Sequence, residues 1–295
     1  MNKYIFIILL SVGLLSVLPM TAQTNPVFKL VKENGQFYFT SSVNGVESKI
    51  MFESGVTGFT MSDAFYQAHK DSLKLEVEPS DEKIRHLGGL HHVKLSASHA
   101  RLRIGDAIFD GPVKIIEGDV NLKIPIQMLH HAADSCNIVW MDLKKSEFSV
   151  ISREQLQGLV KKAKTMDLSF NKWNMPMVKA VLTLNVNGRE TSIEGNFIAD
   201  MGNASLLFMN RSQANVVKMM EKGRIVLKEA RNKEGKYVAN GFYADRLTVC
   251  DRKFKGVSVG AYPFNSMDEY GILGLKFFNI PTIFDFSEMK LYLCE

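Results

Sequence analysis

Residues 51–62 read MFESGVTGFTMS, and residues 197–208 read FIADMGNASLLF. Each segment passes from apolar residues through an acid, one further residue and a Gly, and then through small residues to apolar ones again. A polar turn that contains Gly between two buried strands places its acid at a strand end, with backbone amides nearby. The two segments therefore predict matched acidic turns, one carrying Glu53 and the other Asp200.

Other segments around these turns also recur, in the same order along the chain. The offsets between the copies are 143, 145 and 143 residues, and three matches at nearly one offset are not easily chance. We interpret the chain as a duplicated unit of roughly 120 residues, an ordinary domain size. The recurring pairs are 43–48 with 186–191, 101–104 with 246–249, and 142–150 with 285–293.

Most segments in both halves are short, β-branched and separated by Gly, Asn or Asp, as strands are. Residues 37–40, 94–97 and 179–184 alternate as half-buried strands do, and each Asn-Gly pair of the 43–48 repeat predicts a tight hairpin. Helical pattern is scarce. A helix is predicted over 152–164, where Ser152 and Gln155 form a capping box, and a shorter one over 62–69.

These patterns predict an all-β protein with two lobes and few short helices. We expect the first lobe over residues 23–151, a helical linker over 152–172 and the second lobe over 173–295. The composition, with 46% apolar and 23% charged residues, is that of a globular chain able to bury a core.

The first 22 residues have the order of a secretory signal peptide. A basic start at Lys3 is followed by an apolar run over 4–18, then Pro19 and small residues up to Ala22. We expect cleavage after Ala22 and export to the periplasm or the medium, with no membrane attachment afterwards. The alternative is a retained anchor, but a spanning helix needs ~20 apolar residues and Pro19 makes this run short.

The formal charge argues against nucleic acid as a partner. Cleavage after Ala22 removes one Lys and no acid, so the net charge falls from +5 to +4. Such a charge is too small and too dispersed for a nucleic-acid surface.

Residues 271–278 read GILGLKFF, and with the two acidic turns they resemble the pepsin and retropepsin aspartic proteases, particularly bacterial retropepsin-like members. That family has Asp-Thr/Ser-Gly after a strand, followed later by two apolar residues and a Gly, here 272–274. The resemblance covers nearly the whole chain after residue 22, once per half. It implies a pepsin-like fold made of two retropepsin-like β-barrel halves, an active site between the lobes, an extended polypeptide as substrate and no cofactor.

The family chemistry needs two carboxyl groups that share one proton, because like charges at close range cannot both ionise easily. The resemblance implies Glu53 and Asp200 as this pair, with one activating a water and the other hydrogen-bonding the substrate carbonyl. It also implies a supporting turn whose hydroxyls brace the opposite strand and whose Gly residues allow close backbone approach. Its members here are Ser54, Gly55, Thr57, Met201, Gly202, Asn203 and Gly274.

The sequence departs from the family pattern at three places. Glu53 stands where an Asp is usual, Met201 stands where a hydroxyl residue is usual, and the first-lobe counterpart of 272–274 lies within 124–127 and has no Gly. A carboxyl displaced by ~1 Å can lose about a hundredfold in rate. Three functions therefore stay open: an aspartic-type endopeptidase, an inactive pseudoprotease that binds peptides or an exported protein, and a purely structural periplasmic protein.

A hairpin tip over 86–91, with Gly88 and Gly89, falls where these proteases carry the flap that closes over substrate. A plain surface hairpin is the alternative. All seven histidines lie in the first half, and none has a zinc-motif spacing, so we expect no metal site. The three cysteines are Cys136, Cys250 and Cys294. Cys250 with Cys294 is the candidate disulfide, and three small buried unpaired residues are the alternative.

Overall fold

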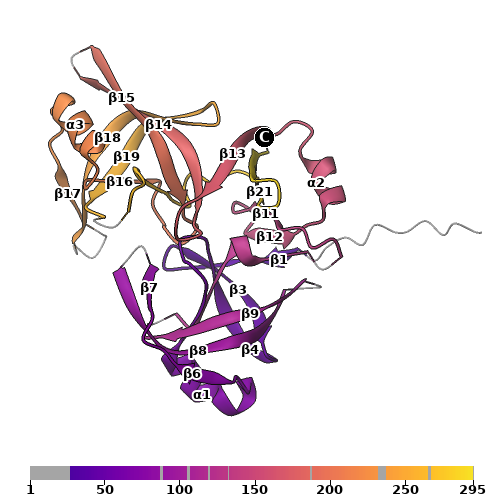
Figure 1. Cartoon of the computed structure of the whole chain (residues 1–295). Coiled ribbons are helices and arrows are strands. Elements are labelled where there is room, and N and C mark those ends of the chain that lie inside the picture. Colours follow the sequence, from indigo (N-terminus) through magenta and orange to yellow (C-terminus); the bar gives the residue numbers. More distant parts are fainter. Residues whose placement is uncertain are drawn as a thin grey trace, which may run out of the picture.

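The chain folds into two lobes built from β-strands (Figure 1). The structure is a computed structural model that describes residues 27–294 except 87–88, 105–106, 119, 132, 187, 232–236 and 265–266. The expected signal peptide, residues 1–22, lies outside the described residues. Within the described ranges, no helix has the length and apolar character that crossing a membrane requires. The predicted all-β, two-lobed fold with few short helices is confirmed.

The first lobe is a nine-stranded sheet in the order β2-β3-β4-β10-β5-β9-β8-β6, with β7 paired to β8. Its strands include the predicted segments 37–40 and 94–97. The strands are β2 (Val31–Glu33), β3 (Gln36–Val43), β4 (Val46–Glu53), β5 (Phe59–Ser62), β6 (Val77–Pro79), β7 (Lys83–His86), β8 (Gly89–Ile104), β9 (Ala107–Ile116) and β10 (Leu122–Pro125).

A second sheet of thirteen strands runs β1-β12-β11-β21-β22-β13-β14-β15-β20-β16-β19-β18-β17. Its strands are β1 (Phe28–Lys29), β11 (Ile138–Asp142), β12 (Glu147–Val150), β13 (Lys164–Phe170), β14 (Pro176–Val186), β15 (Arg189–Ala199), β16 (Leu207–Asn210), β17 (Lys228–Arg231), β18 (Tyr237–Val249), β19 (Arg252–Tyr262), β20 (Gly271–Leu273), β21 (Thr282–Asp285) and β22 (Lys290–Leu293).

Strand pairing joins the two halves of the chain. β11 of the first half pairs with β21 of the second, from Ile138 opposite Asp285 to Met141 opposite Thr282. β1, β12 and β11 thus lie in one sheet with β21, β22 and β13, and this group lies between the two lobes in Figure 1. Because backbone hydrogen bonds cross between the halves, the lobes are held as one unit rather than by a flexible tether.

The two halves repeat the same strand topology. In the first half β4 pairs in parallel with β10, and β5 in parallel with β9. In the second half β15 pairs in parallel with β20, and β16 in parallel with β19. The duplication inferred from the sequence therefore corresponds to a repeated three-dimensional unit.

The helices begin where the sequence offers caps. α1 (Asp63–Leu73) is capped by Ser62, whose Oγ accepts a hydrogen bond from Phe65 N at 3.2 Å. α2 (Arg153–Leu159) has the predicted capping box, and a one-turn 3-10 helix, η1 (Ile126–Met128), follows β10. α2 is shorter than predicted because Lys164 already belongs to β13, which pairs with β22. The third helix is α3 (Ala214–Lys222).

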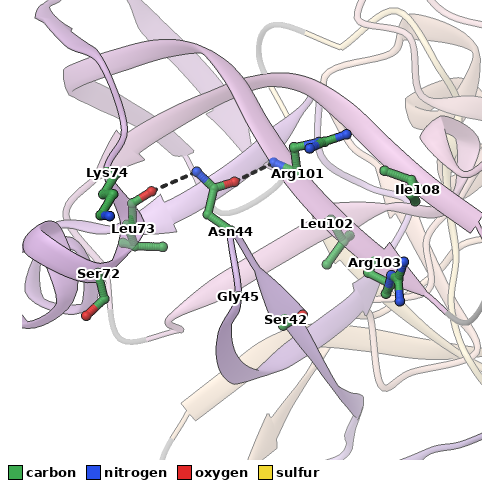
Figure 2. Close-up of a pocket in the computed structure, with 10 residues that line it drawn as sticks. All are labelled: Ser42, Asn44, Gly45, Ser72, Leu73, Lys74, Arg101, Leu102, Arg103 and Ile108. Atoms are coloured by element: carbon green, nitrogen blue, oxygen red, sulfur yellow. Dashed lines mark hydrogen bonds between the residues drawn. The ribbon is translucent and has the colours of Figure 1, made fainter.

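The first Asn-Gly hairpin has the geometry its sequence predicts. Asn44 and Gly45 have φ angles of 48° and 83°, the left-handed pair of a tight β-hairpin turn. The Asn44 side chain also donates to Leu73 O at 2.7 Å and accepts from Arg101 N at 2.7 Å, as Figure 2 shows. These two hydrogen bonds connect the hairpin turn to the end of α1 and to strand β8. The three segments line a pocket of about 630 Å³.

The repeated Asp residues at the hairpins of the shared sheet have a local structural role. Asp142 Oδ1 accepts from Lys144 N and Lys145 N at 3.1 and 3.2 Å. Asp285 Oδ1 accepts from Ser287 N and Glu288 N at 3.1 and 3.0 Å. Each carboxylate therefore closes its own turn, and this requirement explains why an Asp recurs there.

The core is rich in Phe and includes buried residues of both lobes. All three cysteines are unpaired, so the candidate Cys250–Cys294 disulfide was wrong. Cys294 packs against the cluster around Ile138 and Ile283, whereas Cys250 packs against the main core. The alternative of three unpaired residues is the one found, although each is only partly buried rather than buried.

Candidate active site

Glu53 is the last residue of β4, and one oxygen of its carboxyl group accepts hydrogen bonds from three backbone amides. Glu53 Oε1 accepts from Ser54 N at 3.0 Å, from Gly55 N at 2.8 Å and from Gly202 N at 3.1 Å. The side chain is buried, and Gly202 belongs to the other lobe. Three N–H donors, two from its own turn and one from the other lobe, therefore hold this carboxyl oxygen of Glu53 in place.

Asp200 directly follows β15, and Glu53 is its neighbour across the lobes. The Gly202 N–H that donates to Glu53 also donates to Asp200 Oδ1, at 2.8 Å, and the two carboxyl groups hydrogen-bond to each other. A shared donor holds the acceptor oxygens within about 6 Å, where each carboxyl affects the other's protonation. The two acids predicted from the sequence are therefore brought together.

The environment of Asp200 favours its protonated form. Burial, and then the negative charge and hydrogen bond of Glu53, raise the pKa of Asp200 well above its usual value. The backbone amides of Gly202 and Asn203 act in the opposite direction, because they donate to the carboxylate. Of the two carboxyl groups, that of Asp200 is therefore the one whose surroundings favour the protonated form.

Ser54 provides one of the two braces expected beneath the acids. Its Oγ donates to Ala199 O at 2.6 Å and accepts from Met201 N at 2.8 Å, and the side chain is fully buried. Met201, at the matched position of the second lobe, has no hydroxyl and its side chain packs into the core. The brace between the two turns is consequently one-sided.

Replacement of Ser54 by Ala should destabilise the protein by about 2 kcal/mol, because Ala199 O and Met201 N would be buried without their partner. Urea denaturation measures the loss. Ser80→Ala is a matched control, since its Oγ also accepts a backbone N–H, from Glu82, but in an exposed turn. Equal small changes in both variants would contradict a bracing role for Ser54.

The remaining supporting-turn residues lie around the pair. A Cβ added to Gly202 would lie 2.0 Å from Glu53 Oε2. Any residue other than Gly at position 202 would therefore displace the Glu53 side chain. Asn203 Oδ1 accepts from Ser205 N and Ser205 Oγ, which orders the second turn. Thr57 is half-buried in the first turn, between β4 and β5.

Gly274 and Pro125 occupy matched positions beside the two turns. Pro125 is paired with Glu53. Leu273 is paired with Ala199, so the next residue, Gly274, corresponds to Asp200 in the same way. The backbone N–H of Gly274 donates to Leu206 O at 3.0 Å, and that of Leu275 donates to Asn203 O at 2.7 Å. Pro125 has no N–H to donate, so the first lobe cannot form the counterpart of the Gly274–Leu206 hydrogen bond.

Gln127 supports the Glu53 turn with its side chain, and sequence reasoning missed it. Its buried Nε2 contacts Ser54 O and Val56 O at 3.3 Å each, and Asn174 O of the second half at 3.1 Å. Val56 matches Asn203 in the duplication, so the Gln127 side chain replaces a backbone bond of the other lobe. The missing Gly at 124–127 was the available signal, but it did not reveal a replacement.

Gln36 and Tyr38 were also missed as site residues. Gln36 Nε2 donates to Gly202 O at 3.0 Å, and Tyr38 Oη donates to Gln36 Oε1 at 3.2 Å. Burial, followed by the charges of Glu33 and Glu53, raises the pKa of Tyr38. β3 of the first lobe thus reaches the Asp200 turn of the second, a long-range contact for which the sequence carries no local pattern.

The candidate flap is described only in part. Gly88 lies outside the described residues, whereas Gly89 begins β8 and is paired with His86 of β7. In Figure 1, β7 lies on the side of the first lobe that faces the second lobe. In the described part of the chain, no three His, Cys, Asp or Glu side chains are grouped as metal ligands.

The overall structure is similar to that of a known proteinase. A solved structure titled "Crystal structure of aspartic proteinase from Irpex lacteus" matches with a TM-score of 0.57 and 8% sequence identity, over 91% of this chain and 96% of that chain. The likeness concerns the fold. No protein-family model matches the chain, and no curated protein is significantly similar to it in sequence.

Proposed function

We propose that this chain is an exported aspartic-type endopeptidase that uses Glu53 and Asp200 between its lobes. The observation that carries the proposal is the hydrogen-bonded pair of buried carboxyl groups, one from each half, joined by the Gly202 N–H. The similarity in fold to the proteinase from Irpex lacteus supports it. In this proposal residues 1–22 are a signal peptide, the lobes are 23–151 and 173–295, and the mature protein acts in the periplasm or the medium.

The environments of the two acids suggest their roles. Because protonation is favoured at Asp200, this carboxyl would donate a hydrogen bond to the peptide carbonyl oxygen, and Glu53 would take a proton from the water that attacks the carbonyl. Negative charge that develops on the oxygen would thereby meet a donor already in position. The substrate would be an extended polypeptide, paired in strand fashion near the β7–β8 hairpin.

The second candidate is a pseudoprotease that binds a peptide or an exported protein without cutting it. The specific observation in its favour is the crowding of Glu53, whose Oε1 already receives three backbone donors. A base with its lone pairs so occupied is a weaker proton acceptor. Met201 in place of a second hydroxyl adds to the departure from the protease pattern.

Digestion of a diverse peptide library separates these candidates. The purified chain without residues 1–22 is incubated with the library from about pH 3 to 7, beside Asp200→Asn, and products are identified by mass spectrometry. Cleavage lost in the variant supports the endopeptidase. Cleavage that survives the substitution rules out the carboxyl pair, and retention of peptides without cleavage by either form favours the pseudoprotease.

The pH dependence of cleavage should reflect the raised pKa of Asp200. The active form has Asp200 protonated, so kcat/KM should fall as pH rises through this raised pKa rather than near 3.8, the ordinary value for Asp. The falling limb is therefore expected well above pH 4. A limb close to pH 4 in a peptide-cleavage profile would contradict the proposed protonation state.

A further inference from the structure

Lys123 lies on the same sheet face as Glu53, beside the candidate active site. Side chains alternate along a strand, so Met51 shares the face of Glu53 at a distance of about 7 Å along β4. Lys123 of β10 is paired with Met51, and Thr60 of β5 is paired with Lys123. Paired residues point to the same face, so Lys123 lies on the same face of the first-lobe sheet as Glu53.

The duplication places a very different residue at the matched site. Ile198 precedes Asp200 by two residues as Met51 precedes Glu53, and Ile272 is paired with Ile198. Ile198 and Ile272 are buried in an apolar cluster with Met175 and Met267. The strand position next to Ile198 thus carries an apolar side chain in the second lobe, whereas the matched position of the first lobe carries the ammonium group of Lys123.

Lys123 is half-buried and has no ion-pair partner among the residues that the structure describes. Two neighbouring lysines on this face do have one, since Lys49 pairs with Glu33 and Lys114 with Glu82. A cation at a partly desolvated site gains more from a carboxylate partner than a fully exposed cation does. Lys123 is therefore positioned to receive an anion from outside the chain.

We propose that Lys123 makes the first-lobe side of the site a subsite for an acidic side chain, so that bound peptides carry Glu or Asp next to the reacting bond. This inference rests on the proposed function, because it assumes an extended polypeptide between the lobes. A side chain of such a polypeptide that points to the first lobe would meet Lys123, and one that points to the second lobe would meet the Ile198 cluster.

Binding to the non-cleaving variant Asp200→Asn tests the subsite apart from catalysis. The probes are two fluorescein-labelled pools of random peptides of about ten residues, one containing Glu and Asp and the other containing Gln and Asn in their place. Fluorescence anisotropy should show about tenfold tighter binding of the acidic pool. Adding Lys123→Met should remove that ratio, whereas Lys123→Arg should keep it.

Lys114→Met is the matched control, because Lys114 lies on the same face but is already paired with Glu82. An acidic preference that persists in Lys123→Met, or disappears equally in Lys114→Met, would overturn the subsite. Cleavage of the peptide library by the unmodified protein with no acidic preference would overturn the subsite alone. Failure of both pools to bind, together with no cleavage, would overturn the subsite and the proposed function.

Discussion

Replacement of Asp200 by Asn is expected to lower kcat for peptide cleavage by about 10³-fold, the scale of a lost acid–base group. Asn has nearly the same shape, and its side-chain oxygen can still accept from Gly202 N as Asp200 Oδ1 does. Its amide N–H is a much weaker acid than a carboxyl O–H, so it would stabilise the developing negative charge less than the protonated Asp200 of the proposed mechanism. A fluorogenic peptide taken from the library experiment gives the rate.

The same variant should be more stable than the unmodified protein at neutral pH. The pKa of Asp200 is raised in the folded state, so the folded chain holds a proton that the unfolded chain releases as pH rises above about 3.8. The unmodified protein therefore loses stability between that pH and the raised pKa, whereas Asp200→Asn does not. Thermal unfolding should show a gain for the variant at pH 7 that vanishes near pH 3.

Asp268→Asn is the control for both measurements, because Asp268 is exposed and forms a surface ion pair with Lys172. It should change neither the cleavage rate nor the pH dependence of stability appreciably. A tenfold or smaller loss of rate in Asp200→Asn would place the chemistry elsewhere in the molecule. An equal stability gain at pH 3 and pH 7 would contradict the protonated state of Asp200.

The sequence alone predicted the duplication and the acid pair because both have local signals. A Gly-containing turn after an apolar strand marks Glu53 and Asp200 individually, and the nearly constant offset between the copies pairs them. Hairpins such as Asn44-Gly45 are equally local, since the left-handed backbone conformation restricts the residues that fit.

The parts that could not be predicted depend on contacts between distant segments. Gln127 braces a turn more than seventy residues earlier through its side-chain amide. β13 falls in the expected helical linker because β22, at the far end of the chain, offers an edge to pair with. A single Gln has no sequence pattern, and residues 164–170 have no clear strand or helix period. The roles of Gln127 and of β13 therefore become visible only in the folded structure.

Substitution of Gly274 by Ala is expected to destabilise the protein by about 3 kcal/mol, the upper range for overpacking. An added Cβ would lie 2.3 Å from Ser205 O and 2.5 Å from Asn203 O, and both atoms are backbone. The turn that follows Asp200 would have to move, although Leu275 N holds Asn203 O at 2.7 Å. A shift of ~1 Å there should also reduce cleavage about a hundredfold.

Gly58→Ala provides the comparison, because a Cβ added at Gly58, in the other acidic turn, meets nothing within 4 Å. Its melting temperature should stay near that of the unmodified protein, whereas Gly274→Ala should melt roughly 5–10 °C lower. The two variants add the same methyl group, so any difference between them reports the space around the backbone rather than the altered flexibility of the unfolded chain. Equal melting temperatures would mean that the backbone of the Asp200 turn can move at little energetic cost. A turn that moves so easily could not hold Asp200 rigidly against Glu53.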